Sequence, residues 1–163
     1  MSKRIEQLIA DYPDKVRNRK FLAYQIAHFR GLSADEVIES MYTPRQDGEH
    51  VQSSSLPDKT AQIAMNYQER RNKLNREWLQ EMERQLASLS EELDFFEGAI
   101  RSLDGSMSRV MECLVIDGMT WDDTAKVLLM SHANVGKLRK KAIRKLDEMY
   151  AILKVTKSRL KVD

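Results

Sequence analysis

The feature that most constrains this chain is a stretch without proline from residue 58 to residue 103. In its second half, apolar residues recur with alternating steps of four and three, which places them on one stripe of an α-helix. These residues are Met82, Leu86, Leu89, Leu93, Phe96, Ile100 and Leu103. A strict heptad stripe is typical of a coiled-coil seam. We predict one long helix over residues 58–103, whose seam packs either on a second copy of the chain, as a homodimer, or on helices of the same chain.

The composition favours an all-α fold. The 163 residues include six glycines and three prolines, 32% are charged and 7% are aromatic, which disfavours β-sandwiches and long disordered tails. No run approaches the roughly 18 consecutive apolar residues of a membrane span, and the amino terminus lacks the apolar segment of a signal peptide. The single cysteine, Cys113, excludes an internal disulfide and suits a reducing compartment. We therefore expect a soluble cytoplasmic protein without a membrane partner.

Two further segments precede the long helix. Residues 1–42 are predicted to form a head of short helices, with a stop at Gly31 and a capping box at Ser33–Glu36 that starts a helix to about Tyr42. Residues 43–57 contain Pro44, Asp47-Gly48 and three consecutive serines with almost no apolar periodicity. This composition predicts a loop or hinge between two modules.

After the long helix, residues 104–150 read as three helices separated by short turns. Gly118 is expected in the left-handed conformation at the end of the first helix, Thr120 is a predicted N-cap for the second, and Ser131 for the third. A short helix, a turn of about three residues and a longer basic helix are typical of a DNA-binding helix-turn-helix. Residues 151–163 are expected to form a basic carboxy-terminal tail.

The charge is distributed unevenly along the chain. Residues 130–163 contain ten Lys or Arg and three Asp or Glu, a net charge of +7, whereas residues 1–129 contain 17 basic and 22 acidic side chains, a net charge of −5. The asymmetry favours a polyanion partner, with a solvated basic helix face as the alternative. The candidate contacts with double-stranded DNA are His132, Asn134, Lys137, Lys140, Lys141 and Arg144.

Each candidate has a stated role and an ordinary alternative. Asn134 can pair with the adenine edge, or it can support the N-cap. His132 can read a base or a phosphate, or it can be an exposed residue without a contact. The lysines can bind phosphates. Gly136 is unusual inside a helix, and either close approach of the DNA backbone or simple tolerance explains it.

Residues 113–146 resemble region four of bacterial sigma factors and the phage regulators that share that module. The most specific match is the closing run Lys141-Ala142-Ile143-Arg144-Lys145-Leu146. Two departures are Thr124, where the family usually has isoleucine, and Leu129-Met130, which replace a glycine-containing turn.

The upstream region is similar to phage regulators of the ArpU or RinA type, which join a helical head and a serine-rich break before an aspartate, here Asp58, to a long helix and a sigma-like module. The resemblance implies a phage or prophage activator of late genes, acting in the cytoplasm of a bacterial host cell on promoter DNA and on host RNA polymerase.

The sequence offers no pattern typical of an enzyme. His28 and His50 lack metal-ligand spacing, there is no Gly-rich phosphate loop, and no nucleophile and base stand out, so we expect no catalytic residue, metal or cofactor. Two other functions remain open. One is a phage small terminase subunit, which would assemble into rings of about eight or more chains; the other is a sigma-like module that binds polymerase rather than DNA.

Overall fold

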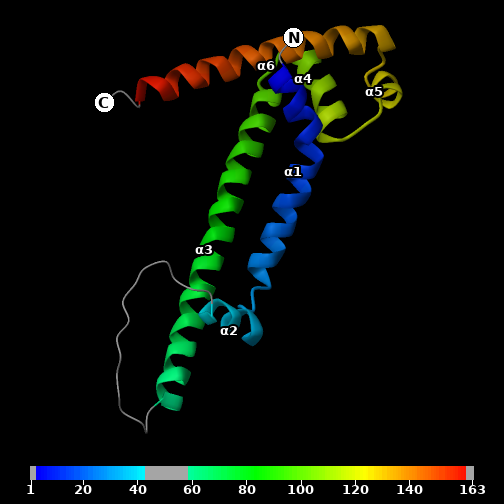
Figure 1. Cartoon of the computed structure of the whole chain (residues 1–163). Helices are drawn as coiled ribbons and strands as arrows, with labels where there is room; N and C mark the ends of the chain where they lie inside the picture. Colours follow the sequence, from blue (N-terminus) through cyan, green and yellow to red (C-terminus); the bar gives the residue numbers. More distant parts are fainter. Residues whose placement is uncertain (1–2, 43–58, 161–163) are drawn as a thin grey trace. The chain divides into compact units, whose positions relative to one another are not determined.

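The computed structural model describes residues 3–42 and 59–160, and within these ranges the chain forms helices and no strand (Figure 1). The all-α prediction is therefore confirmed. None of the described helices is long and apolar enough to cross a membrane. The loop or hinge predicted over residues 43–57 lies outside the described residues. The helices are α1 (Lys3–Ala27), α2 (Ala34–Tyr42), α3 (Lys59–Arg101), α4 (Gly105–Met111), the π-helical turn η1 (Glu112–Ile116), α5 (Trp121–Val127) and α6 (His132–Leu160).

The chain divides into two compact units whose borders fall inside α1 and α3. The first unit comprises residues 1–20 and 88–163, and the second comprises residues 21–87. The division differs from the predicted modules. The head expected over residues 1–42 is split, because the start of α1 supplies apolar side chains to the same core as α6.

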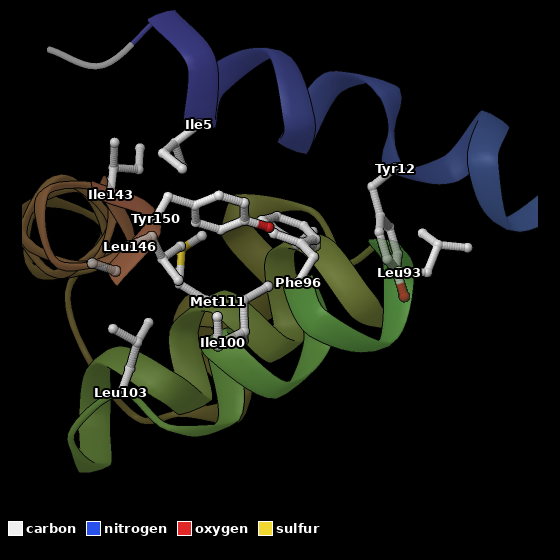
Figure 2. Packing of buried hydrophobic residues seen from close by; sticks show 13 residues of the cluster. Ile5, Tyr12, Leu93, Phe96, Ile100, Leu103, Met111, Ile143, Leu146 and Tyr150 are labelled. Atoms are coloured by element: carbon white, nitrogen blue, oxygen red, sulfur yellow. The ribbon is translucent and has the colours of Figure 1, made fainter. Parts of the chain in front are cut away.

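The core of the first unit is built from helices far apart in the sequence. Figure 2 shows Ile5 and Tyr12 of α1 facing side chains of α3, α4 and α6. The Tyr12 ring lies 5.8 Å from the Phe96 ring, and the Tyr12 hydroxyl donates a 2.8 Å hydrogen bond to Glu97. The carboxy-terminal helices therefore share one core with α1 and the end of α3. Its buried members are Ile5, Tyr12, Leu93, Phe96, Ala99, Ile100, Leu103, Met111, Val115, Ala142, Ile143, Leu146 and Tyr150.

The heptad stripe of α3 is occupied within the chain. Leu93, Phe96 and Ile100 are almost fully buried in the core of the first unit, and Leu89 packs against it. Upstream, Met82 is buried and Leu86 is partly buried in the second unit. The predicted oligomerisation seam is therefore not a free surface, because intramolecular packing satisfies the same periodicity.

Ion pairs border the first unit's core where α1 and α3 meet. Lys15 pairs with Glu92, and Arg19 lies 3.3 Å from Asp94 and 3.9 Å from Glu97. Exposed pairs of this kind contribute about 0–1 kcal/mol each. Burial of the apolar cluster is therefore the larger stabilising contribution to this unit.

In the second unit, the capping box of α2 has the predicted geometry. The Ser33 amide donates a 2.8 Å hydrogen bond to the Glu36 carboxylate, and the Glu36 amide donates to Ser33 Oγ at 3.3 Å. Gly31 has φ of +82°, and a Cβ there would lie 2.7 Å from the Asn75 side chain. Asn75 in turn accepts a hydrogen bond from the Leu32 amide at 2.8 Å. Glycine is required here by both its conformation and the close approach of α3.

The carboxy-terminal segment corrects one boundary. The sequence analysis ends the third basic helix near residue 150 and assigns residues 151–163 to a tail, whereas α6 continues to Leu160. Residues 151–160 contain neither glycine nor proline, so nothing in the local sequence interrupts the helix.

Candidate nucleic-acid interface

Side-chain caps define the starts of α5 and α6. Thr120 Oγ1 accepts a 3.1 Å hydrogen bond from the Asp123 amide and donates one of 2.7 Å to the Asp123 carboxylate. Ser131 Oγ accepts a 3.2 Å hydrogen bond from the Asn134 amide. Thr120 and Ser131 thus occupy the N-caps at which the sequence analysis placed them, and they fix where each helix begins.

The helix before α5 ends in a wide turn. The Asp117 amide donates to the Glu112 carbonyl, and the Met119 amide to the Cys113 carbonyl, both at 2.9 Å. Gly118 follows with φ of +66°, the left-handed conformation expected from the sequence. Burial raises the pKa of the Cys113 thiol, which stays protonated at neutral pH and packs as a small apolar side chain.

The turn between α5 and α6 places leucine in a position that favours glycine. Leu129 has φ of 51° and is 93% exposed. The Leu129 amide donates to the Lys126 carbonyl at 3.3 Å, and the Met130 amide to the Ala125 carbonyl at 3.0 Å. These two bonds form a Schellman motif, whose left-handed residue is usually glycine. The tight turn therefore persists without the glycine of the sigma-factor family, at the cost of backbone strain at Leu129.

Thr124, the second difference from the sigma-factor pattern that the sequence resembles, is fully buried in α5. Its hydroxyl has no hydrogen-bond partner among the described residues. A buried hydroxyl without a partner costs about 1–3 kcal/mol relative to an apolar group of the same shape. The isoleucine usual in the family would avoid this cost.

The exposed face of α6 brings together most of the predicted DNA contacts. Lys137, Lys141 and Arg144 are spaced by four and three residues, so they lie on one stripe, with Asn134 one turn before Lys137 and Lys140 at its side. All five are exposed. None of the four cations has an ion-pair partner within residues 3–42 and 59–160, and the Asn134 side chain makes only a weak 4.0 Å contact with the Met130 sulfur.

His132 is separated from this stripe. Its Nε2 lies 3.2 Å from Asp122 Oδ1, and its ring lies 5.5 Å from the Trp121 ring. Both partners belong to α5. The structure therefore gives His132 a contact that the sequence analysis did not foresee, between the starts of the two helices.

Trp121 packs against the glycine inside α6. A Cβ on Gly136 would lie 3.3 Å from Trp121 Cζ3, closer than an ordinary side-chain contact. An alanine at this position would require the partly exposed indole ring to shift by a few tenths of an ångström.

Arg139 contacts both Trp121 and a residue of α1. Its guanidinium lies 5.9 Å from the Trp121 ring and donates two hydrogen bonds, of 3.1 and 2.7 Å, to the Glu6 carboxylate. From the sequence, Arg139 is predicted only as one of the basic residues of the carboxy-terminal region, without this role. The available signal was the position of Arg139 beside the inward-facing Leu138 and Ala142.

Within the described part of the chain, no group of three or more His, Cys, Asp or Glu side chains is placed to hold a metal ion. Comparison with known protein families, curated proteins and solved structures finds no match. The resemblance to sigma region four and to ArpU or RinA regulators therefore remains a prediction from the residues quoted above.

Proposed function

We propose that this protein binds double-stranded DNA through the exposed stripe of α6 and acts as a sequence-specific transcription regulator. The observation that best supports the proposal is a set of four cations on the helix that follows the tight turn, none of which has an acidic partner among the described residues: Lys137, Lys140, Lys141 and Arg144. Such cations gain free energy by replacing counterions on DNA phosphates. The Asn134 amide, near the start of the same helix, has the donor and acceptor pattern that pairs with adenine.

The sequence resemblance supports a narrower biological role. We infer a phage or prophage activator of late genes, which would work in the cytoplasm of a bacterial host. Because α3 buries its heptad stripe within the chain, the proposal does not depend on a coiled-coil dimer.

The test replaces three cations of the stripe. The Lys137→Ala, Lys140→Ala, Lys141→Ala variant should lose on the order of 100-fold in affinity for a duplex of about 30 base pairs at about 0.1 M salt, and the slope of log affinity against log salt should fall by about 0.9 per lost phosphate contact. Fluorescence anisotropy with labelled duplexes measures both quantities.

A charge-matched control separates the stripe from net charge. Lys20→Ala, Arg30→Ala, Arg76→Ala removes three exposed cations outside α6 that make no ion pair with a described residue. This control should bind DNA nearly as tightly as the unchanged protein. Equal affinity of the two triple variants would contradict the proposal. If the α6 variant alone loses affinity, selection of bound fragments from random duplexes would define the recognised sequence.

Two exposed apolar side chains favour a polymerase contact as a second candidate function. Val127 and Leu129 protrude at the end of α5 and in the turn after it. Exposed apolar groups near a basic DNA-binding face suit a protein partner. Retention of RNA polymerase core enzyme by the immobilised protein without DNA tests this, and Val127→Ser, Leu129→Ser should abolish retention while preserving DNA binding.

A further inference from the structure

A groove of the first unit lies apart from the exposed stripe of α6. It has a volume of about 410 Å³ and is formed by α1, α3 and the second half of α6. An adjoining hollow of about 350 Å³ shares Arg4, Tyr150, Leu153 and Lys157 with it. Volumes of about 300–1,000 Å³ are typical of sites for small molecules.

The groove combines apolar walls with unpaired cations. Leu8, Phe95 and Leu153 supply apolar surface. Arg4, Lys154 and Lys157 line the groove or the adjoining hollow, and none of them has an acidic partner in the part of the chain that the structure describes.

Two acidic residues also border the groove, on α3. Glu92 is compensated by its ion pair with Lys15, and Glu91 is exposed. Two cations of the groove, Arg4 and Lys157, and Lys154 of the adjoining hollow outnumber the one uncompensated carboxylate, so the two hollows together favour an anion.

Tyr150 contributes to the wall of both hollows. It is only 7% exposed, and its hydroxyl has no hydrogen-bond partner among the described residues. Its ring packs edge-on against Phe95, with 4.9 Å between centroids, and the Arg4 guanidinium lies 5.1 Å from the ring centroid. Burial raises the pKa of Tyr150 to about 12, so the hydroxyl remains a donor at neutral pH.

We propose that this groove binds a small organic anion, a carboxylate or a phosphate monoester with an aromatic or apolar body. The anionic group binds Arg4 and Lys157, and the body packs on Leu8, Phe95 and Leu153. This assignment does not depend on DNA binding.

The experiment uses the full chain and four probes in isothermal titration calorimetry. They are 1-naphthoate, 1-naphthyl phosphate, the neutral 1-naphthalenemethanol and inorganic phosphate. We expect at least one naphthyl anion to bind one-to-one with Kd below about 1 mM, and the neutral alcohol and inorganic phosphate to bind at least about tenfold more weakly, because each lacks one half of the recognised chemistry. The tighter of the two anions identifies the head group.

Variants locate the binding. Arg4→Gln, Lys157→Gln removes two exposed groove cations and should weaken binding about tenfold or more, whereas Lys20→Gln, Arg30→Gln should leave it unchanged. Tyr150→Phe removes only a buried hydroxyl and should leave binding unchanged. Absence of anion binding at 1 mM, or equal affinity in the Arg4→Gln, Lys157→Gln variant and its control, would overturn the assignment.

Discussion

Each of the two faces of α6 has a basic residue and an isoleucine, but the burial and the ion pairing of these side chains differ between the faces. On one face Arg139 is fixed by Glu6 and Trp121, and Ile143 is buried in the core. On the other, Lys140 has no ion-pair partner among the described residues, and Ile152 is exposed. The comparison shows that the register of a helix against its core decides the role of a side chain. The residue type alone does not predict that Arg139 forms an ion pair with Glu6 or that Lys140 has none among the described residues.

The largest expected effect comes from isoleucine to alanine changes on the two faces. Ile143 is 3% exposed and Ile152 is 68% exposed. Ile143→Ala should lower the free energy of unfolding by about 2–5 kcal/mol, because it removes buried methyl groups and leaves a cavity. Ile152→Ala should change it by less than about 0.5 kcal/mol. Urea unfolding followed by circular dichroism measures both, and equal losses would show that the two faces are not distinct.

A smaller effect is expected for the neighbouring cations Arg139 and Lys140. Arg139→Ala should cost about 1–2 kcal/mol of stability, because it removes a two-bonded ion pair and a contact with an aromatic ring. Lys140→Ala should change stability by less than about 0.5 kcal/mol but weaken DNA binding.

Arg139→Lys provides the control for charge. It keeps the positive charge but cannot reproduce the two parallel hydrogen bonds to Glu6, so it should recover only part of the lost stability. Full recovery of the free energy of unfolding would mean that the positive charge at position 139, rather than the two hydrogen bonds to Glu6, stabilises the protein.

Features set by local chemistry could be predicted from the sequence. The caps Ser33, Thr120 and Ser131 and the left-handed Gly118 need only nearby residues, and each lies where the sequence analysis placed it. The long helix also agrees to within two residues at each end, Lys59–Arg101 against residues 58–103.

Features set by tertiary packing could not be predicted from the sequence. The heptad stripe of α3 is equally compatible with a second chain and with α1 and α6, because periodicity reports a buried face and not its partner. The contact between Glu6 and Arg139 joins residues 133 positions apart, and no local pattern predicts it. The close approach of Trp121 to Gly136 is likewise a tertiary contact that no local pattern predicts.

Removing the Thr124 hydroxyl, which has no hydrogen-bond partner among the described residues, should stabilise the protein. Thr124→Val keeps the shape of the side chain and removes this buried hydroxyl, so stability should rise by about 1 kcal/mol and Tm by about 2–4 °C. Thr156 is an exposed residue of α6, and its hydroxyl donates a 3.0 Å hydrogen bond to the Ile152 carbonyl. Thr156→Val removes this hydroxyl and should give no gain in stability. Differential scanning calorimetry distinguishes them, and a loss for Thr124→Val would indicate that its hydroxyl has a partner.

The smallest expected effect is at the turn that determines where α6 begins. Leu129→Gly relieves about 1–2 kcal/mol of left-handed strain, while the added freedom of glycine in the unfolded chain offsets about 0.4–1 kcal/mol, so a net gain of about 0.5 kcal/mol is expected. Val127→Gly, two residues earlier and also exposed, has no strain to relieve and should lose about 1 kcal/mol. Urea unfolding measures both changes in the free energy of unfolding. A gain for Leu129→Gly and a loss for Val127→Gly would confirm that the leucine side chain is tolerated at position 129 rather than required for folding. A loss of stability in Leu129→Gly would instead indicate that this exposed leucine contributes to the folded state in a way that backbone conformation does not explain.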